Sequence, residues 1–370
     1  MAELVDERHA LIDRVTIYGV AVVDIKEQGA LITMGVLSIK AGVKNYAMTA
    51  RGQEYSAINI KNTAYCDLFA SYTGRKKGEQ LGILTLSVGH EKTYNLNCFS
   101  ADAIQQRLEK VKDCLWQDYG ILIDYGNAKY KSLEINKTIT LRCAYEDYKE
   151  PLLLIMASLP GTLRLGGNNI IEPPSRPLQC IDKNMISAGT MRRKSGKTGL
   201  GLKIYDKARQ LRKVHNVNIN DNILRCEITL TGAKKIKHDL GTNVVSEITD
   251  DCINQYYSNF VRCNIIDANN KKWVVRVKML KKIINEVYIP GSHTWIYNLI
   301  VRIQAMEKSI NYPLLLDYTE LHPLVDDILK GKSRKMRYNI RKRISDFCRE
   351  NDIYCTDGTA KINELFDKLS

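Results

Sequence analysis

Three short segments of the chain alternate between polar and apolar residues, and this pattern constrains the fold more than any other feature. The segments span residues 133–139, 202–207 and 224–230. Successive side chains of a β-strand point to opposite faces of its sheet, so a period of two is typical of a strand with one apolar face. The polar sets are Glu134, Asn136 and Thr138; Lys203, Tyr205 and Lys207; and Arg225, Glu227 and Thr229. If the three segments are neighbouring strands, these side chains share one face.

The remaining pattern predicts an α+β fold, with an antiparallel-sheet domain followed by a mainly helical C-terminal domain. Runs of β-branched residues between 16 and 37 predict further strands. Apolar residues at three- and four-residue spacing over 101–117 predict a helix with Ser100 as its N-cap. The spacing is helical from about Lys234 onward, most clearly over 273–287, 293–308, 317–329 and 333–349, and we place a domain change near residue 240. We therefore expect an N-terminal tail (1–14), an α+β domain (15–240) and a helical domain (241–370).

The shared polar face suits metal-assisted attack on a phosphodiester. Glu134 and Glu227 offer hard oxygen ligands for a divalent ion, Mg²⁺ or Mn²⁺. The phenol of Tyr205 is a weak nucleophile at its free pKa of about 10 and needs a metal, a base or nearby cations to activate it. Lys207 can offset charge on the phosphoryl oxygens. The alternative is a solvated sheet face on which Glu, Lys and Arg form cross-strand pairs.

Positive charge is concentrated in two stretches of the sequence. The chain carries a formal charge of +14, which favours a polyanionic partner. Residues 191–215 and 328–349 each hold nine Lys or Arg and one acid. The first stretch flanks Tyr205, and the second predicts a basic helix that docks in a major groove or lies along phosphates, or else a solvated helical face. The candidate DNA-binding residues are Arg192, Arg193, Lys194, Lys197, Lys203, Arg209, Arg334, Lys335, Arg337, Arg341, Lys342 and Arg343.

Several other classes of protein and site are disfavoured by the sequence. No apolar run reaches the roughly 18 residues of a membrane span, and the acidic N-terminus lacks a signal-peptide core, so we expect a cytoplasmic protein without membrane contact. The ten cysteines show no Cys-x-x-Cys spacing and are interpreted as reduced thiols, several of them in the core. The segment 196–198 ends like a P-loop, but Met191 stands where that motif needs its first glycine.

At the same residues the chain resembles the replication proteins of phages and plasmids typified by the filamentous-phage gene II nicking endonuclease and its gene X segment. The resembling stretches are 132–138, 202–207 and 224–228, in that order, followed by a helical tail. The resemblance implies a nicking-endonuclease-like sheet domain in a rolling-circle initiator, which nicks one strand at an origin and stays attached to the 5′ phosphate. In the family, the tyrosine of a Tyr-x-Lys motif is the nucleophile. Tyr205 stands at the position of that tyrosine, and Lys207 stands at the position of the lysine. Asn136 stands where the family has a metal-binding Asp, and the chain has no His-x-His metal motif.

The implied partners are origin DNA, single-stranded or supercoiled, together with a host helicase and polymerase. Two other functions remain open. One is a non-catalytic, sequence-specific DNA-binding regulator in which Tyr205 is structural. The other is a relaxase for conjugative mobilisation, which would use the same chemistry in another role.

Overall fold

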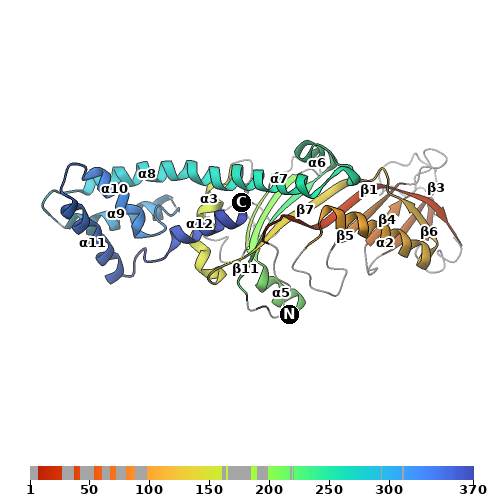
Figure 1. Cartoon of the computed structure of the whole chain (residues 1–370), viewed down its shortest axis with the longest axis horizontal. Coiled ribbons are helices and arrows are strands. Elements are labelled where there is room, and N and C mark those ends of the chain that lie inside the picture. Colours follow the sequence, from red (N-terminus) through yellow and green to blue (C-terminus); the bar gives the residue numbers. More distant parts are fainter. Residues whose placement is uncertain are drawn as a thin grey trace. The chain divides into compact units, whose positions relative to one another are not determined.

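The computed structural model describes most of the chain, including all of the segments that carry the candidate metal site. The described residues are 7–26, 37–41, 54–60, 67–71, 81–87, 98–160, 164–165, 185–189, 199–216, 219, 221–292, 294–310 and 312–370. Antiparallel strands are followed by a long helical region, so the predicted α+β class is confirmed (Figure 1). The chain forms two compact units. The first comprises 1–139, 190–202 and 225–257, and the second comprises 140–189, 203–224 and 258–370.

The first unit is built on one antiparallel sheet. Its strands follow the order β2-β3-β4-β5-β1-β7-β11-β10, and β6 also pairs with β1. β10 belongs to this unit as far as Leu202, and β11 belongs to it from Arg225 onward. The bounds are β1 Leu11–Ile25, β2 Leu37–Ala41, β3 Glu54–Ile60, β4 Asp67–Ser71, β5 Leu81–Ser87, β6 Ile121–Asp124, β7 Lys129–Thr140, β10 Gly199–Asp206 and β11 Ile223–Thr231. The helical elements that begin in this unit are α2 Ala101–Tyr119, α6 Ala233–Leu240, the 3₁₀ turn Val245–Glu247 and α7 Asp250–Val261.

β1 is the central strand of this sheet, and irregularities in its pairing let it meet several partners. It pairs antiparallel with β5, β6 and β7. The register with β5 shifts between Tyr18 and Val20, where Gly19 has a φ of 79°. A bulge residue in the left-handed region is best occupied by glycine, which has no Cβ to clash. β1 starts at Leu11 and so takes in four residues that the sequence pattern assigned to the tail.

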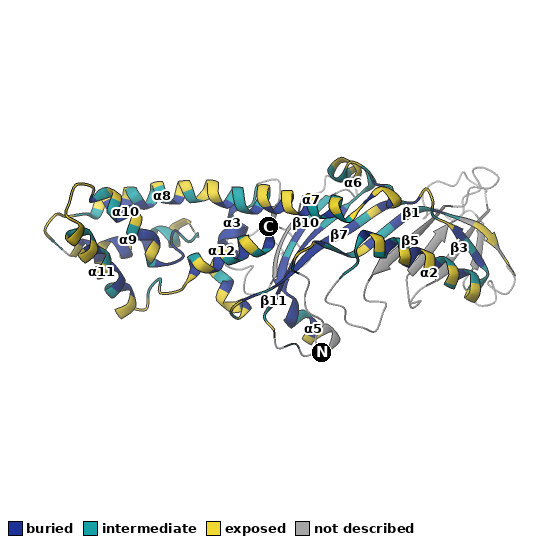
Figure 2. Cartoon of the chain, viewed as in Figure 1, coloured by how far each residue is buried: buried dark blue, intermediate teal, exposed yellow. Residues whose placement is uncertain are grey.

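Helix α2 forms where the spacing predicts it. Ser100 caps its N-terminus by accepting a hydrogen bond from the Ala103 amide at 3.0 Å, and Gly120 ends it in the left-handed conformation. Ile104 and Leu108 on its apolar stripe are fully buried. Burial of this kind, shown in dark blue in Figure 2, contributes roughly 1.5–3 kcal/mol for each large apolar side chain.

The second unit is mainly helical. Its elements are the 3₁₀ turn Tyr145–Tyr148, α3 Lys149–Ser158, β8 Arg164–Leu165, β9 Met185–Gly189, α5 Lys207–His215, the π-helical turn Arg262–Ile266, α8 Asp267–Val287, α9 Thr294–Ile310, the 3₁₀ turn Tyr318–Glu320, α10 Leu321–Ile328, α11 Arg334–Glu350 and α12 Gly358–Leu369. The four helical segments predicted between 273 and 349 are confirmed as α8 to α11. α8, α9, α10 and α11 enclose one apolar core that includes Leu280, Trp295, Leu299, Leu321 and Ile344.

Within the described part of the chain, no helix is both long and apolar enough to cross a membrane. The cysteines of these segments are all free thiols, as predicted, and Cys226 and Cys348 are buried in the core. Cys66 and Cys180 lie outside the described residues.

Candidate metal centre

Three carboxylates from three adjacent strands of the first unit converge on one point. Asp13 comes from β1, Glu134 from β7 and Glu227 from β11, and one oxygen of each lies within 4.8 Å of the others. Glu227 is buried, whereas Asp13 and Glu134 are half-buried. Carboxylate oxygens are the ligands that Mg²⁺ and Mn²⁺ prefer. This acidic cluster can therefore hold a divalent ion on a face that is not fully closed to solvent.

A β-bulge delivers Asp13 to the cluster. Ile12 pairs with Ile135 and Arg14 pairs with Glu134, so Asp13 is the extra residue between two consecutive pairs. A bulge places two residues opposite one and re-aims a side chain, which is why bulges are common beside functional sites. Asp13 and Arg14 together face Glu134, and the Asp13 carboxylate joins that of Glu134.

Arg225 brings a buried positive charge into this cluster. Its side chain is 1% exposed, its Nε donates to Thr138 Oγ1 at 2.9 Å, and its Nη1 lies 3.5 Å from Asp13 Oδ2. Three carboxylates so close together repel one another unless cations compensate them. Arg225 supplies part of that compensation and contacts Asp13, and a bound divalent ion would add to it.

Asn136 joins β7 to its neighbours through its amide. Its Nδ2 lies 3.3 Å from the Leu11 carbonyl and 3.2 Å from Cys98 Sγ, and its Oδ1 accepts a hydrogen bond from Thr138 Oγ1 at 3.4 Å. Thr138 thus connects Asn136 to Arg225. The structure gives Asn136 a positioning role, and Asp13 supplies the third carboxylate of the cluster. Asn136 as a metal ligand stays a prediction.

The polar face of these strands is largely buried. Asn136, Thr138, Arg225 and Glu227 are 1–5% exposed, so the alternative of a solvated face is wrong for these four side chains. The opposite face carries the predicted apolar residues Leu133, Ile135 and Ile139, all fully buried, and Lys137 is buried there as well. On that opposite face burial raises the pKa of the Cys226 thiol to about 12, which keeps it protonated and unsuited to metal binding. Buried charged groups of this kind often add no stability over an apolar packing of similar volume.

The structure corrects the expected position of Lys207. The strand pattern places Lys207 on the face of Tyr205, but β10 ends at Asp206 and Lys207 is the first residue of α5. The Asp206 carboxylate accepts a hydrogen bond from the Arg209 amide at 2.8 Å, and this N-cap starts the helix. Lys207 Nζ still lies 6.0 Å from the centre of the Tyr205 ring, and it donates to Gln210 Oε1 at 2.7 Å. Tyr205 and Lys207, both 8% exposed, belong to the second unit.

The candidate DNA-binding residues fall into three groups. Arg192, Arg193, Lys194 and Lys197 lie outside the described residues. Lys203 in β10 and Arg209 in α5 are half-buried. The other six lie on α11, where Arg334, Lys335, Lys342 and Arg343 are exposed and Arg337 is half-buried. Arg341 differs from them, because its Nη1 lies 3.0 Å from Asp326 Oδ2 and its charge is partly used within the unit.

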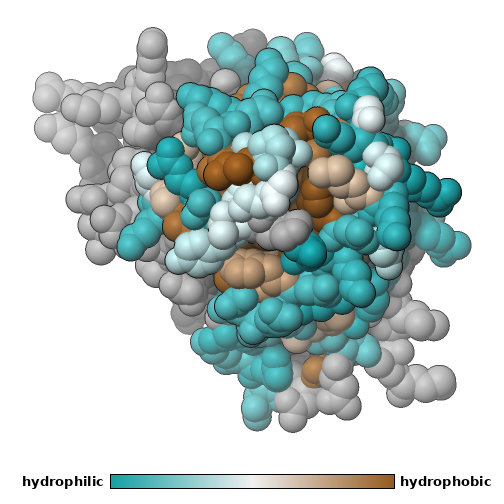
Figure 3. All heavy atoms as spheres, turned by 90° about the vertical axis from the view of Figure 1, so that its left-hand side faces the viewer, coloured by the Kyte–Doolittle hydropathy of each residue, from teal (hydrophilic) through white to brown (hydrophobic). Residues whose placement is uncertain are grey.

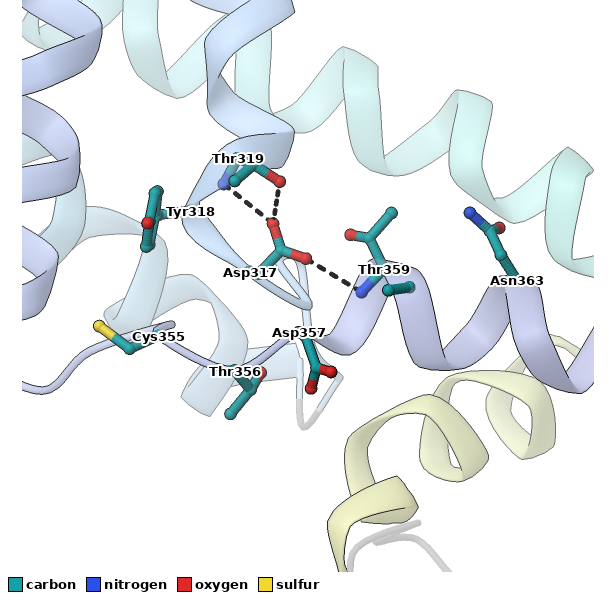
Figure 4. A pocket seen from close by; sticks show the side chains of 9 residues that line it. Asp317, Tyr318, Thr319, Cys355, Thr356, Asp357, Thr359 and Asn363 are labelled. Carbon is teal, nitrogen blue, oxygen red and sulfur yellow. Dashed lines mark hydrogen bonds between the residues drawn. The ribbon is translucent and has the colours of Figure 1, made fainter. Parts of the chain in front are cut away.

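A pocket of about 500 Å³ in the second unit has no counterpart in the sequence analysis (Figure 4). Asp317 lies at its centre and accepts hydrogen bonds from the Thr319 amide at 2.9 Å and the Thr359 amide at 3.0 Å. One carboxylate thus caps the turn before α10 and the start of α12. Gly358 packs so closely there that a Cβ would lie 2.8 Å from the Leu316 carbonyl oxygen. These contacts give the residues of the pocket a structural role, which is to hold the start of α12 against the turn before α10.

A comparison with protein-family models finds no match to this chain, and a search of curated proteins finds no match either. Asp13 is the member of the acidic cluster that the sequence pattern missed. The signal for it was the apolar run of residues 10–12, which extends the strand pattern of β1 toward the N-terminus.

Proposed function

We propose that the protein is a metal-dependent, site-specific DNA-nicking endonuclease that starts rolling-circle replication of a phage or plasmid. The observation that carries the proposal is the Asp13, Glu134 and Glu227 cluster with Arg225 buried beside it. Oxygen ligands with half-buried members suit Mg²⁺ or Mn²⁺ that keeps open positions for phosphate oxygens. The formal charge of +14 favours a polyanionic substrate.

The chemistry we propose is transesterification by Tyr205. Its phenolic oxygen attacks the phosphorus, the new Oη–P bond forms, and the bond from phosphorus to the 3′ oxygen breaks. In the net balance the phenol proton passes to the departing oxygen, which leaves a 3′ hydroxyl that can prime synthesis. A divalent ion held by Asp13, Glu134 and Glu227 would supply Lewis-acid stabilisation of the phosphoryl oxygens. A host helicase would then unwind the duplex, and a host polymerase would extend the 3′ end.

Within this mechanism each named residue has a separate task. Asp13, Glu134 and Glu227 would hold the ion, and Arg225 with Thr138 would keep Asp13 in place. Lys207, whose Nζ lies 6.0 Å from the Tyr205 ring, would offset the charge of the phenolate as the proton leaves.

The experiment combines a covalent-adduct assay with direct metal binding. Wild-type protein is incubated with Mn²⁺ and a labelled library of random-sequence single-stranded 60-mers, and adducts are resolved on a denaturing gel. We expect an adduct from wild type, none from Tyr205→Phe, and loss of both adduct and Mn²⁺ binding from Glu227→Gln. Asp251→Asn is the matched control, since Asp251 is an exposed acid of the same unit outside the cluster. An adduct from Tyr205→Phe equal to that of wild type would show that Tyr205 is not the nucleophile.

A second candidate is a DNA-binding regulator without nicking activity. The exposed basic residues of α11 favour it, because they need no metal to contact phosphates. Normal Mn²⁺-independent binding of DNA together with a complete lack of adduct from wild type would support this alternative.

A further inference from the structure

Over the first three turns of helix α11, the charged side chains of the solvent-exposed face are all positive. The exposed residues of its first three turns are Arg334, Lys335, Tyr338, Asn339, Lys342 and Arg343. Positions three and four residues apart share one side of a helix, so Lys335, Tyr338, Asn339, Lys342 and Arg343 form one continuous stripe. The first acid of the helix, Asp346, comes after this stripe and is half-buried. A merely solvated helical face usually mixes both signs of charge.

The opposite side of α11 is held rigidly by α10. Ile340 and Ile344 are buried in the helical core together with Leu321 and Val325 of α10. Two polar contacts also tie the helices, the 3.0 Å ion pair of Arg341 with Asp326 and the 3.2 Å contact of His322 Nε2 with Ser345 Oγ. The helix that carries the basic stripe is therefore packed against the core, and base recognition needs side chains that project from such an ordered element.

The connection between these helices is short and turns sharply. Residues 329–333 join α10 to α11, and Gly331 adopts a φ of 95° within them. Ser333 then caps α11 by accepting a hydrogen bond from the Met336 amide at 3.2 Å. Two helices joined by a short, glycine-containing turn, with the second one exposed, resemble a helix-turn-helix in their connection. Figure 3 looks onto the end of the second unit that carries α10 and α11, where hydrophilic residues surround small apolar patches.

The chemistry of the stripe matches duplex DNA. Asn339 and Arg343 lie one turn apart, and an amide and a guanidinium are the groups that pair bidentately with adenine and guanine edges in the major groove. Both line a hollow of about 320 Å³ beside the helix, together with Lys335 and Met336. Tyr338 is 57% exposed and adds an aromatic ring to the same exposed stripe. The lysines suit backbone phosphates on either side of the groove.

We propose that α10 and α11 form a helix-turn-helix unit that reads duplex DNA, with the first three turns of α11 in the major groove. Asn339 and Arg343 contact bases, and Lys335 and Lys342 contact phosphates. This inference rests on the proposed function, because both take DNA as the ligand. It assigns duplex recognition to the second unit and makes it independent of the metal centre in the first.

The first experiment measures duplex binding by the full chain in EDTA, where no nicking can occur. A fluorescein-labelled 25-bp duplex of mixed sequence is titrated between 50 and 200 mM KCl. The triple variant Lys335→Gln, Lys342→Gln, Arg343→Gln should lower the magnitude of the slope of log K against log salt by about 1.8, which corresponds to the two phosphate contacts of Lys335 and Lys342, while the loss of Arg343 removes a base contact. Its affinity at 100 mM KCl should fall at least tenfold.

The matched control is Lys271→Gln, Lys272→Gln, Lys278→Gln, which removes the same charge from exposed positions on α8. We expect this control to bind within about twofold of wild type. Equal losses from both triple variants would overturn the proposal, since only net charge would then matter. Binding of wild type to vesicles containing anionic lipid, without binding to the duplex, would also overturn it.

A second experiment tests the base contacts. Wild type is used to select from duplexes with 20 random base pairs, and we expect an enriched sequence. Asn339→Ala should lower the preference for adenine at one position by about tenfold and leave the salt slope unchanged, because Asn339 carries no charge. A lack of enrichment by wild type would overturn major-groove reading. A missing covalent adduct, with these results intact, would overturn only the nicking proposal.

Discussion

Arg225 Nη1 lies 3.5 Å from Asp13 Oδ2, although 212 residues separate the two in the chain. The guanidinium is almost fully buried, whereas the Asp13 side chain is 28% exposed. The pair joins the central strand β1 to β11 on the face that also carries Glu134 and Glu227. Arg225 therefore contributes to the charge balance of the acidic cluster.

Replacing Arg225 should destabilise the protein and make its stability depend on metal. Arg225→Met keeps much of the volume but leaves three carboxylates without this cation, at a cost of about 2–4 kcal/mol. Urea unfolding should show this loss, and Mn²⁺ should restore part of it because the ion binds only the folded cluster. Lys131→Met, at an exposed position of β7, should change the free energy of unfolding by less than about 0.5 kcal/mol. Equal stability of Arg225→Met and wild type would contradict the proposed charge balance.

Two variants test whether Asp13 or Asn136 is the third metal ligand beside Glu134 and Glu227. The structure supports Asp13, and the sequence suggests Asn136. Asp13→Asn should raise the dissociation constant for Mn²⁺ at least tenfold, because it removes a charged ligand. Asn136→Ala should raise it by less than threefold, because the amide is engaged with Leu11, Cys98 and Thr138. Isothermal titration calorimetry measures both. The reverse order of effects would assign the third ligand to Asn136.

Adjacent residues at the start of α12 should respond in opposite directions. Gly358→Ala adds a Cβ 2.8 Å from the Leu316 carbonyl oxygen and should destabilise the protein by about 1–3 kcal/mol. Thr359→Val should be neutral or slightly stabilising, because Thr359 Oγ1 is buried with no hydrogen-bond partner among the described residues. Thermal unfolding of the two variants compares them directly. A destabilising Thr359→Val would indicate a partner for that hydroxyl.

Glu307 should make the stability of the protein fall as the pH rises. Burial raises its pKa, although Tyr354 and the amides of Leu314 and Leu315 donate hydrogen bonds to its carboxylate. The folded state therefore binds this proton more tightly than the unfolded chain. The resulting stabilisation is fully present below the unfolded pKa and is lost as the pH rises through the folded pKa.

Glu307→Gln should remove this dependence, because an amide cannot ionise. Relative to wild type, the variant should become more stable as the pH is raised from about 4 to 7. Urea unfolding at several pH values measures the difference, and the subtraction cancels the contribution of other groups. A constant difference across this range would show that burial does not perturb Glu307.

Much of the fold followed from sequence because its signals are local. The period of two predicted β7, β10 and β11, and the three- and four-residue spacing predicted α2 and α8 to α11. The inner stripe of α11 was predicted from the same spacing, and Ile340 and Ile344 are buried. Glu134 and Glu227 were predicted to lie together, and they do.

The features that the sequence did not predict are of two kinds. Some interrupt a local sequence pattern, and others are contacts between distant segments of the chain. Asp13 enters the site through a bulge, which interrupts the period of two on which strand prediction depends. Lys207 leaves the strand because Asp206 prefers to cap a helix. The contact of Arg225 with Asp13 spans most of the domain, so no local pattern could indicate it. The predicted roles of Tyr205 and of the α11 cations await the experiments above.

The contacts of α12 also have a consequence for the order of folding. Glu364 accepts hydrogen bonds from the Arg142 amide at 3.0 Å and from the Tyr148 hydroxyl at 2.5 Å, across more than 200 residues. During synthesis, residues 140–158 must therefore leave the ribosome long before their partners exist. The last segment of the first unit ends at Tyr257 and is made well before Glu364. The sheet can then form during translation, while α3 keeps apolar side chains exposed for longer and is the segment that chaperones would protect.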